Sequence, residues 1–337
     1  MQSSFDFVSV VFETEFPLLR LQARSMARFL PESLCREIVV LDNSTRGMPS
    51  SERAALLPEY GDLRPRVRVL RPADVARVPG MVGWQSQQVL KLLVAEHLGA
   101  DRYVVLDAKN HFVATPDVGF FQSPDDRARV NTYGYEQHPL RPNLERVLEY
   151  VGVDPAPYVG SFTATVTPFV LDRALVQAMV ADIEARSGRP FAEEFAAHEL
   201  TEFFLYSAWI IAGGRRLEDV FDFHQVFCPV VWPRKADRAG VEAAVAQARS
   251  AHTPLFAVHR RALNRLDAEG SRALSTYWTD LGLFGSVPAA ERFVQDFRAS
   301  SARTERAKKV RELPYRAVTV LRRARNRLDP RSLSGQR

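Results

Sequence analysis

The sequence predicts an α/β fold: a single domain with a central, mainly parallel sheet flanked by helices. Short apolar runs rich in β-branched residues recur at residues 7–12, 37–41, 67–70 and 103–106. Because these runs are continuous rather than alternating, they suit strands covered on both faces. One helix-like segment joins the first two runs. Such a β-α-β unit implies a right-handed crossover and parallel strands.

The helix between the first two strands begins at Pro17, a residue favoured in the first helical turn. The first strand leaves through Glu13-Thr14-Glu15 and the second through Asp42-Asn43-Ser44. Both exits lie on one edge of a parallel sheet. Their carboxylate and amide oxygens match the donors of a nucleotide's base and ribose, although Asp42-Asn43-Ser44 is also an ordinary turn sequence.

The chain is organised around the stretch from Gly83 to Phe112. Its first part is helix-like, with a polar face that carries Gln85, Gln88 and Lys91. The strand Tyr103–Leu106 follows and ends at Asp107, and the next polar residues are Lys109, Asn110 and His111. An acidic residue at the carboxyl end of a buried strand lies where open α/β sheets bind ligands. A strand end capped by a solvated turn gives the same pattern, so the geometry alone leaves both interpretations open.

The second half is predicted to continue with further helices and strands. These are a helix at 144–150, strands within 161–171 interrupted by Pro168, a helix at 174–187 capped by Asp172, a helix at 241–250 and a strand at 255–259. One helix is expected from His198 through Tyr206. It would place His198, Glu202 and Tyr206 on one face.

Length and composition exclude several classes of protein. With 337 residues, of which 46% are apolar, the chain can bury a substantial core. No apolar run approaches the roughly 20 residues that span a bilayer, and the first residues lack a signal-peptide pattern. We therefore expect a cytoplasmic protein. The presence of only Cys35 and Cys228 disfavours a disulfide framework or a cysteine metal site.

Positive charge is concentrated at the C-terminus. Residues 298–337 hold 13 lysines and arginines against three acidic residues, so this segment carries +10 and the rest of the chain −5. A helix over 315–328 would surround an apolar side with arginines, a pattern typical of a segment on an anionic membrane surface. A solvated tail has the same composition. Basic and aromatic residues are not interleaved along the body, so nucleic acid is not expected as a partner.

Two common phosphate-binding loops are missing from the sequence. No Gly-x-Gly-x-x-Gly follows the first strand, and no Gly-x-x-x-x-Gly-Lys-Ser/Thr loop occurs. A dinucleotide-binding or P-loop domain would therefore lack its phosphate cradle.

The chain resembles the GT-A glycosyltransferases, nucleotide-sugar enzymes with a single Rossmann-like domain. The resemblance is closest to a bacterial branch described mainly as domains of unknown function. It extends over roughly residues 5–285 and is carried by the opening strand and helix and by Gly83–Leu92, Leu106-Asp107, Thr201–Tyr206 and Val258–Arg261. It implies a domain over 1–298, with a nucleotide-binding part at about 1–115 and an acceptor-side part at about 116–298. A basic helical or disordered tail at 299–337 would follow.

In that family an Asp-x-Asp motif holds a divalent cation that bridges the donor's two phosphates, and a late His often completes the coordination. Asp107 matches the first Asp and His259 resembles the late His, but Lys109 stands at the second Asp. The resemblance thus implies Mg²⁺ or Mn²⁺ held by Asp107, His259 and waters, with Asn110 as a neutral ligand. Alternatively, the cation is absent and the Lys109 ammonium neutralises the diphosphate.

The resemblance also assigns nucleotide contacts and a catalytic base. The contacts are expected from Glu13, Thr14, Asp42, Asn43, Gln85, Gln88, Lys91 and Asp107. For inversion, displacement at the anomeric carbon needs a carboxylate that deprotonates the acceptor hydroxyl. Glu202 is the first choice for this base or for acceptor binding and Glu199 the second, while Lys109 would act through its charge. A carboxylate with only a capping role fits either glutamate as well.

The expected function is transfer of a sugar from a GDP- or UDP-hexose to a hydroxyl of a glycan or glycolipid, in bacterial polysaccharide biosynthesis. A nucleotidylyltransferase that makes the nucleotide sugar is one alternative. Such an enzyme would need a glycine-rich, basic phosphate-binding loop after the first strand, where this chain has Glu13-Thr14-Glu15. A non-catalytic module that binds a nucleotide sugar or nucleic acid is the other alternative, which the basic tail suggests.

Overall fold

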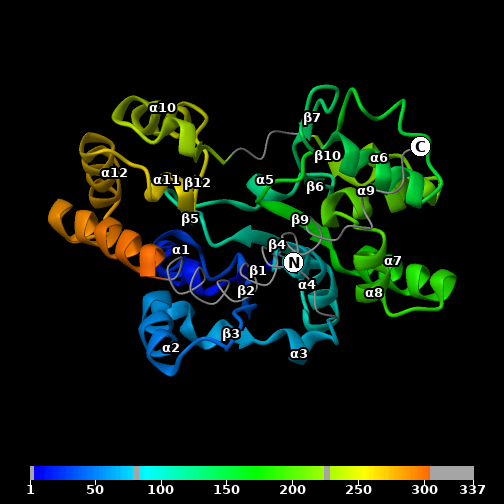
Figure 1. Cartoon of the computed structure of the whole chain (residues 1–337), viewed down its shortest axis with the longest axis horizontal. Coiled ribbons are helices and arrows are strands. Elements are labelled where there is room, and N and C mark those ends of the chain that lie inside the picture. Colours follow the sequence, from blue (N-terminus) through cyan, green and yellow to red (C-terminus); the bar gives the residue numbers. More distant parts are fainter. Residues whose placement is uncertain (1–3, 79–82, 224–227, 304–337) are drawn as a thin grey trace, which may run out of the picture.

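The computed structural model describes residues 4–78, 83–223 and 228–303. It confirms the predicted α/β class, with a central sheet in the order β3-β2-β1-β4-β9 and flanking helices (Figure 1). β1 pairs in parallel with β2 and β4, β2 pairs in parallel with β3, and β9 runs antiparallel to β4. These strands are β1 (Phe5–Val11), β2 (Cys35–Asp42), β3 (Val67–Leu70), β4 (Arg102–Asp107) and β9 (Phe169–Asp172).

The register of the sheet brings the predicted polar exits to one edge. β1 is buried along its whole length, as its continuous apolar run predicts. At its end, Val11 pairs with Asp42 and Val10 with Asp107. Neighbouring strands are about 4.8 Å apart, so the two aspartates flank β1 with backbones roughly 10 Å apart.

Helices flank the sheet. α1 (Phe16–Phe29) packs against α2 and β5, whereas α4 (Gly83–Leu93) packs against β1, α7 and α9. α7 (Arg173–Ser187) has the predicted cap, because Asp172 accepts a hydrogen bond from Leu175 N at 3.0 Å. The other helices are α2 (Ser50–Leu56), α3 (Pro72–Val75), α5 (Val118–Phe121), α6 (Arg141–Tyr150), α8 (Phe191–Ala197), α9 (Glu202–Ala212), α10 (Arg238–Ser250), α11 (Arg260–Leu263) and α12 (Ala268–Asp280).

A second sheet brings the C-terminal part of the chain to the Asp107 turn. β5 (Asn110–Phe112) follows β4 closely and pairs antiparallel with β12 (Leu255–Val258), which pairs in parallel with β11 (Val230–Val231). Val258 N donates to the Lys109 carbonyl at 3.3 Å. His259 therefore follows directly beside Lys109. Two smaller sheets pair β6 (Ala128–Arg129) with β10 (Phe221–Asp222) and β7 (Thr132–Tyr133) with β8 (Phe162–Thr163).

The predicted continuous helix from His198 through Tyr206 is wrong. α8 ends at Ala197 and α9 begins at Glu202, because Glu199 between them has a left-handed backbone with φ of +49°. A left-handed residue cannot continue a right-handed helix. His198 contacts Glu194 at 3.1 Å, so it does not share a face with Glu202 and Tyr206.

The predicted basic tail falls mostly outside the described residues. Residues 287–303 are helical, so the domain end predicted at residue 298 lies inside a helical stretch. The amphipathic helix expected at 315–328 lies outside the described residues. Within the described ranges, no helix is both long and apolar enough to cross a membrane.

His111 joins the second sheet to α12 in the core. Its buried Nε2 accepts a hydrogen bond from Trp278 Nε1 at 3.0 Å, and its Nδ1 lies 3.4 Å from the Lys109 carbonyl. A neutral ring with its hydrogen on Nδ1 satisfies both partners. Burial lowers the pKa of His111 to about 4.

We predict that acidification destabilises the fold partly through His111. Between pH 6.5 and about 4, the unfolded residue takes up a proton that the folded one does not, so the free energy of unfolding falls as the pH falls. At pH 5 this contribution is about 2 kcal/mol. Urea unfolding at pH 7 and pH 5 measures it. His111→Gln still accepts from Trp278 and should lose less stability than wild type.

The control is His252→Asn, at an exposed position with a positive φ that Asn tolerates. It should keep the pH dependence of wild type. Equal losses in wild type and His111→Gln would contradict the prediction.

Candidate active site

Asp107 lies between two lysines at the carboxyl end of β4. Lys109 contacts one carboxylate oxygen, and Lys91 Nζ lies 3.3 Å from the other. Burial alone would raise the pKa of Asp107, but the two ammonium groups hold it well below its usual range. The carboxylate is therefore ionised at neutral pH, and 31% of the side chain stays exposed.

Lys91 is buried and joins three elements. It reaches from α4 to Asp107 and to Glu202, whose Oε1 lies 3.2 Å from Nζ. Burial disfavours the ammonium, but the two carboxylates raise the pKa of Lys91 above its usual value. Burial raises the pKa of Glu202, and Lys91 opposes that rise. Ion pairs thus link three predicted residues: Glu202, Lys91 and Asp107. We call these three residues the ionic chain.

Gln22 of α1, to which sequence reasoning assigned no role, holds the turn after β4. Its Nε2 donates to the carbonyls of Asp107 at 2.8 Å and Asn110 at 2.9 Å, and its Oε1 accepts from Ser9 Oγ at 2.8 Å. Gln22 lies on the buried stripe of α1, four residues from both Leu18 and Met26. The sequence could have indicated this role, because a glutamine among the apolar positions of a helix is expected to be buried, and a buried amide needs hydrogen-bond partners.

Asn110 supports the same turn. It is fully buried, and its Oδ1 accepts from the Asp107 N–H and from the Thr167 hydroxyl, both at 2.8 Å. These two bonds occupy both lone pairs of the amide oxygen. Asn110 is therefore placed to hold the turn rather than to coordinate a cation.

His259 lies beside Lys109 and caps α11. Its Nδ1 accepts a hydrogen bond from Arg261 N at 3.1 Å, so the neutral ring carries its hydrogen on Nε2. Burial and the neighbouring cations Lys109 and Arg260 lower the pKa of His259 to about 4. At neutral pH the ring therefore offers an N–H donor at Nε2 and not a lone pair.

This donor set does not fit a divalent cation. Two lysines already neutralise Asp107, both lone pairs of the Asn110 oxygen are used, and His259 carries a hydrogen on Nε2. The Lys109 ammonium has no lone pair to offer. Among residues 4–78, 83–223 and 228–303, no group of three His, Cys, Asp or Glu side chains is arranged to hold a metal. The positive charge at this turn comes from the chain itself.

Asp42, at the end of β2, is occupied by its own loop. It is buried and accepts hydrogen bonds from Ser44 N at 3.1 Å and Arg71 Nη1 at 2.7 Å. Burial raises its pKa, but these hydrogen bonds, with that of the Ser44 hydroxyl, bring it below the usual value. In the structure Asp42 therefore shapes the loop that follows β2.

The other predicted residues of the first two strand ends link neighbouring segments. Glu13 accepts from the Thr45 backbone N–H, which joins the ends of β1 and β2. Asn43 Nδ2 donates to Ser86 Oγ at 2.8 Å, which joins β2 to α4. The ends of β1 and β2 and the start of α4 thus form one connected edge.

The two predicted glutamines of α4 differ in their surroundings. Gln85 is partly exposed, whereas Gln88 is buried one turn before Lys91. Within the described part of the chain, neither end of the Gln88 amide has a hydrogen-bond partner. Such orphaned buried amides are rare, so Gln88 retains hydrogen-bonding capacity beside the ionic chain.

Glu199 lies apart from the other predicted residues. Its side chain is 66% exposed and its carboxylate lies 3.4 Å from Arg146 of α6. The break between α8 and α9 separates it from Glu202.

Arg260 and Glu15 extend the site beyond the residues singled out from the sequence. Arg260 Nη1 lies 3.2 Å from the predicted residue Thr14, so α11 reaches back to the end of β1. Burial and the charge of Asp107 raise the pKa of Glu15, and Arg260 opposes that rise. In the sequence, Arg260 could have been found from its position directly after His259. Glu15 could have been found only from its place in the segment that follows the first strand.

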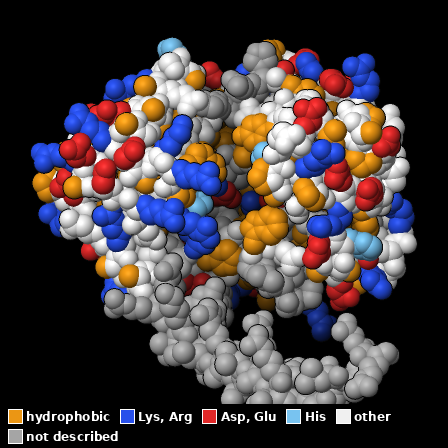
Figure 2. All heavy atoms as spheres, turned by 45° about the horizontal axis from the view of Figure 1, so that its top comes forward, with side chains coloured by type: hydrophobic (Ala, Val, Ile, Leu, Met, Phe, Trp, Pro, Cys, Tyr) orange, Lys and Arg blue, Asp and Glu red, His pale blue; other side chains and the backbone are white. Residues whose placement is uncertain are grey.

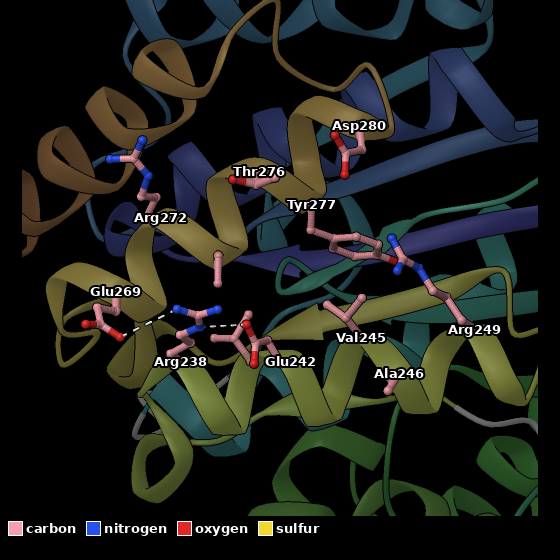
Figure 3. Close-up of a pocket in the computed structure, with 12 residues that line it drawn as sticks. Arg238, Glu242, Val245, Ala246, Arg249, Glu269, Arg272, Thr276, Tyr277 and Asp280 are labelled. Carbon is pink, nitrogen blue, oxygen red and sulfur yellow. Dashed lines mark hydrogen bonds and ion pairs between the residues drawn. The ribbon is translucent and has the colours of Figure 1, made fainter.

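One face of the molecule is hollowed, with acidic, basic and histidine side chains inside the hollow and hydrophobic side chains along both sides (Figure 2). A separate groove of about 500 Å³ lies between α10 and α12 (Figure 3). There Arg238 lies 2.7 Å from Glu242, and Arg249 lies 5.7 Å from the centre of the Tyr277 ring. The groove contains none of the predicted site residues, so it is not the candidate site.

We predict that Gln22→Leu lowers the free energy of unfolding by about 2–4 kcal/mol, because it leaves buried carbonyls and the Ser9 hydroxyl without partners. Denaturant unfolding measures the change. Gln247→Leu, at an exposed position of α10, is the control and should shift stability by no more than about 0.5 kcal/mol. Equal stability of the two variants would contradict the prediction.

Several solved glycosyltransferase structures are similar to this chain. The galactosyltransferase LgtC, in complex with donor and acceptor sugar analogs, is 14% identical with a TM-score of 0.47, over 86% of this chain and 100% of LgtC. The bifunctional glycosyltransferase WbbM is 11% identical with a TM-score of 0.43, over 76% of this chain and 46% of WbbM. Mouse xyloside xylosyltransferase 1 is 9% identical with a TM-score of 0.40, over 75% of this chain and 97% of the mouse chain.

No curated protein matches the sequence. The model of a family of unknown function, DUF6492, matches residues 6–234. Since this match covers more than half of the chain, the protein belongs to that family of unknown function.

Proposed function

We propose that this protein is a glycosyltransferase that moves a sugar from a nucleotide-sugar donor, a GDP- or UDP-hexose, to a hydroxyl of a glycan or glycolipid. The observation that carries the proposal is the ionised Asp107 between Lys91 and Lys109 at the carboxyl edge of a parallel sheet. Open α/β sheets bind their ligands outside this edge. The sequence resemblance assigns the same residue to the donor diphosphate.

The chain's own cations would stabilise the leaving diphosphate. When the bond from the anomeric carbon to the diphosphate breaks, negative charge develops on oxygen, and stabilising that charge is usually the largest catalytic effect. Lys109 lies at the turn, His259 offers its Nε2–H, and Arg260 reaches the end of β1. Lys109 and Arg260 would supply the charge that a divalent cation supplies in the Asp-x-Asp enzymes, and neutral His259 would add a hydrogen bond.

Glu202 remains the candidate base for the acceptor hydroxyl. Burial raises its pKa, which makes its carboxylate a stronger base than an exposed one, although Lys91 opposes that rise. Lys91 holds this carboxylate next to Asp107. Glu199, exposed and paired with Arg146, has no part in the proposed mechanism.

Donor binding and turnover test the proposal. At least one of the UDP-, GDP-, CMP- or dTDP-sugars should raise the melting temperature of wild type, since ligands of the folded state stabilise it. With that donor, Asp107→Ala should release nucleoside diphosphate about 100-fold more slowly, because it removes the carboxylate that orients Lys91 and Lys109. Circular dichroism checks that the variant, in which Lys91 keeps Glu202 as a partner, is folded. Asp101→Ala, exposed at the other end of β4, is the control. Turnover by Asp107→Ala at the wild-type rate would rule out this site.

Because the Lys109 ammonium is proposed to take the place of a divalent cation, turnover should depend little on added metal. Wild type should keep most of its turnover in EDTA, because an ammonium cannot be chelated. Lys109→Ala should lose activity in every buffer. Lys109→Asp, which places a second carboxylate two residues after Asp107, should become dependent on added Mn²⁺. Turnover of wild type and both variants is measured in EDTA and in Mn²⁺. Complete loss of wild-type activity in EDTA, restored by Mg²⁺ or Mn²⁺, would refute the role of Lys109.

If Glu202 is the base, Glu202→Gln should lower kcat by about 100-fold and change donor affinity little, since the amide keeps the shape but cannot accept the proton. Steady-state kinetics with donor titration separates the two effects. A loss of donor affinity as large as the loss of kcat would instead show that Glu202 serves to hold Lys91.

A further inference from the structure

Exposed cations lie beside an exposed tryptophan, Trp232. This residue follows β11, and 48% of its surface is accessible. Arg234 and Lys235 come next, in a short 3-10 helix, and Arg261 lies in α11; all three are exposed. Within the described ranges, none of these three side chains forms a hydrogen bond or an ion pair. We call Trp232, Arg234, Lys235 and Arg261 the basic face.

Tertiary packing makes these residues one surface. The 3-10 helix Pro233–Lys235 packs against α11. The Trp232 ring lies 5.5 Å from that of His259, which caps α11 two residues before Arg261. His259 N also donates to the Val231 carbonyl at 3.1 Å. The cations of the two segments are therefore held side by side, with the tryptophan between the second sheet and α11.

The acidic residues closest in sequence serve as helix caps. Asp237 begins α10, where its Oδ1 accepts from Gly240 N at 2.7 Å. Asp267 begins α12, where its Oδ1 accepts from Gly270 N at 2.6 Å. In the described part of the chain, neither carboxylate forms an ion pair with the basic face. The positive charge of the face therefore remains available to an anionic partner.

The basic face adjoins the candidate site. Arg260, next to Arg261, lies 3.2 Å from Thr14, and His259 follows directly beside Lys109. Figure 2 shows Lys and Arg side chains along one side of the hollow, next to hydrophobic and histidine side chains. A partner bound to the basic face would therefore lie at the rim of the hollow.

The basic end of the chain starts at the same place. Asn264, directly after α11, donates to Ser301 Oγ at 2.8 Å, and Arg298 donates to the Leu263 carbonyl at 2.8 Å. These contacts hold the last described helical residues against the end of α11. Residues 304–337 continue from there and contain 11 lysines and arginines against three acidic residues. A second group of positive charges thus begins next to the first.

An anionic lipid surface matches this combination. Tryptophan is favoured at membrane interfaces, because its ring is apolar and its N–H can bond to headgroups. Clustered lysines and arginines are attracted to anionic headgroups. Stable attachment takes two signals, which the basic face and the basic end of the chain would supply. Single-stranded nucleic acid matches less well, since its sites stack successive bases on several aromatic rings and the basic face contains one tryptophan.

We propose that the basic face docks onto an anionic membrane surface, with Trp232 at the level of the lipid headgroups and its three cations beside it. The rim of the hollow would then lie next to the bilayer. The inference goes beyond the proposed function and does not depend on it, because binding to lipid requires neither nucleotide nor sugar.

Co-sedimentation of the full chain with vesicles tests the proposal. Wild type should bind phosphatidylcholine vesicles that contain about 30% phosphatidylglycerol, should not bind phosphatidylcholine alone, and should be released by about 500 mM salt. The double variant Arg234→Glu/Lys235→Glu should bind the anionic vesicles about 10-fold more weakly or worse. The matched control is Arg53→Glu/Arg64→Glu, which makes the same change of charge at exposed positions of α2 and the segment before β3. It should stay within about twofold of wild type.

Tryptophan fluorescence shows whether Trp232 itself meets the lipid. Anionic vesicles should shift the emission of wild type to shorter wavelength, because a tryptophan enters a less polar environment. Trp232→Phe should lose this shift, whereas Trp84→Phe, at another exposed position, should keep it. Residues 304–337 contain no tryptophan, so lipid contact of the chain end alone leaves the emission unchanged.

The outcomes separate the basic face from the chain end and from the donor site. The inference is overturned if wild type does not bind anionic vesicles, if Arg234→Glu/Lys235→Glu binds them as wild type does, or if Trp232→Phe keeps the shift. UDP and GDP affinity should stay unchanged in the double variant, since Lys109, His259 and Arg260 are the proposed diphosphate contacts. An equal loss of nucleotide or single-stranded RNA affinity would assign the face to that ligand and also overturn the inference.

The two proposals fail independently. If anionic vesicles do not bind but nucleotides do, the proposed function stands without the docking surface. If vesicles bind through the basic face but no nucleotide sugar binds, the docking surface stands and the proposed function falls. Melting temperatures identify any variant that does not fold, and the fluorescence of wild type with Trp232→Phe then carries the comparison.

Discussion

The buried ammonium of Lys91 is the constraint on which the site depends. Removing an ammonium from water costs several kcal/mol, and only well-placed carboxylates can offset that cost. Lys91 therefore requires both Asp107 and Glu202, at 3.3 and 3.2 Å. These residues come from β4 and α9, which belong to the two predicted halves of the domain. One desolvated charge thus fixes the distance between β4 and α9.

Lys109, two residues after Asp107, determines the electrostatics of the strand end together with Lys91. Where two carboxylates would need a cation to relieve their repulsion, Asp107 here lies between two ammonium groups and stays ionised. His259, kept neutral by burial and by its cationic neighbours, adds a hydrogen-bond donor without adding charge. The turn therefore presents cations that are part of the chain and already oriented by it, as the proposed role at a diphosphate requires.

Buried residues give this turn its defined geometry. Gln22 binds its two carbonyls from the side of α1, and Asn110 with Thr167 binds it from the core. His111, one residue further, fastens β5 to α12 through Trp278. Side chains meant to act on a ligand keep a defined geometry only when such supporting contacts restrict them.

The sequence by itself determined the α/β class, the parallel pairing of the first two strands, the Asp172 cap and the place of Asp107 at a strand end. Each follows from local signals: continuous apolar runs, helical periodicity and a capping residue. Tertiary structure alone decided the break at Glu199, the pairing of Lys91 with Glu202, the role of Gln22 and the tautomer of His259. The break needs a positive φ that Glu does not signal. The bonds of Gln22 to the Asp107 and Asn110 carbonyls and of Lys91 to Glu202 join residues 85 to 111 positions apart, a separation at which only the packed fold determines which polar groups meet.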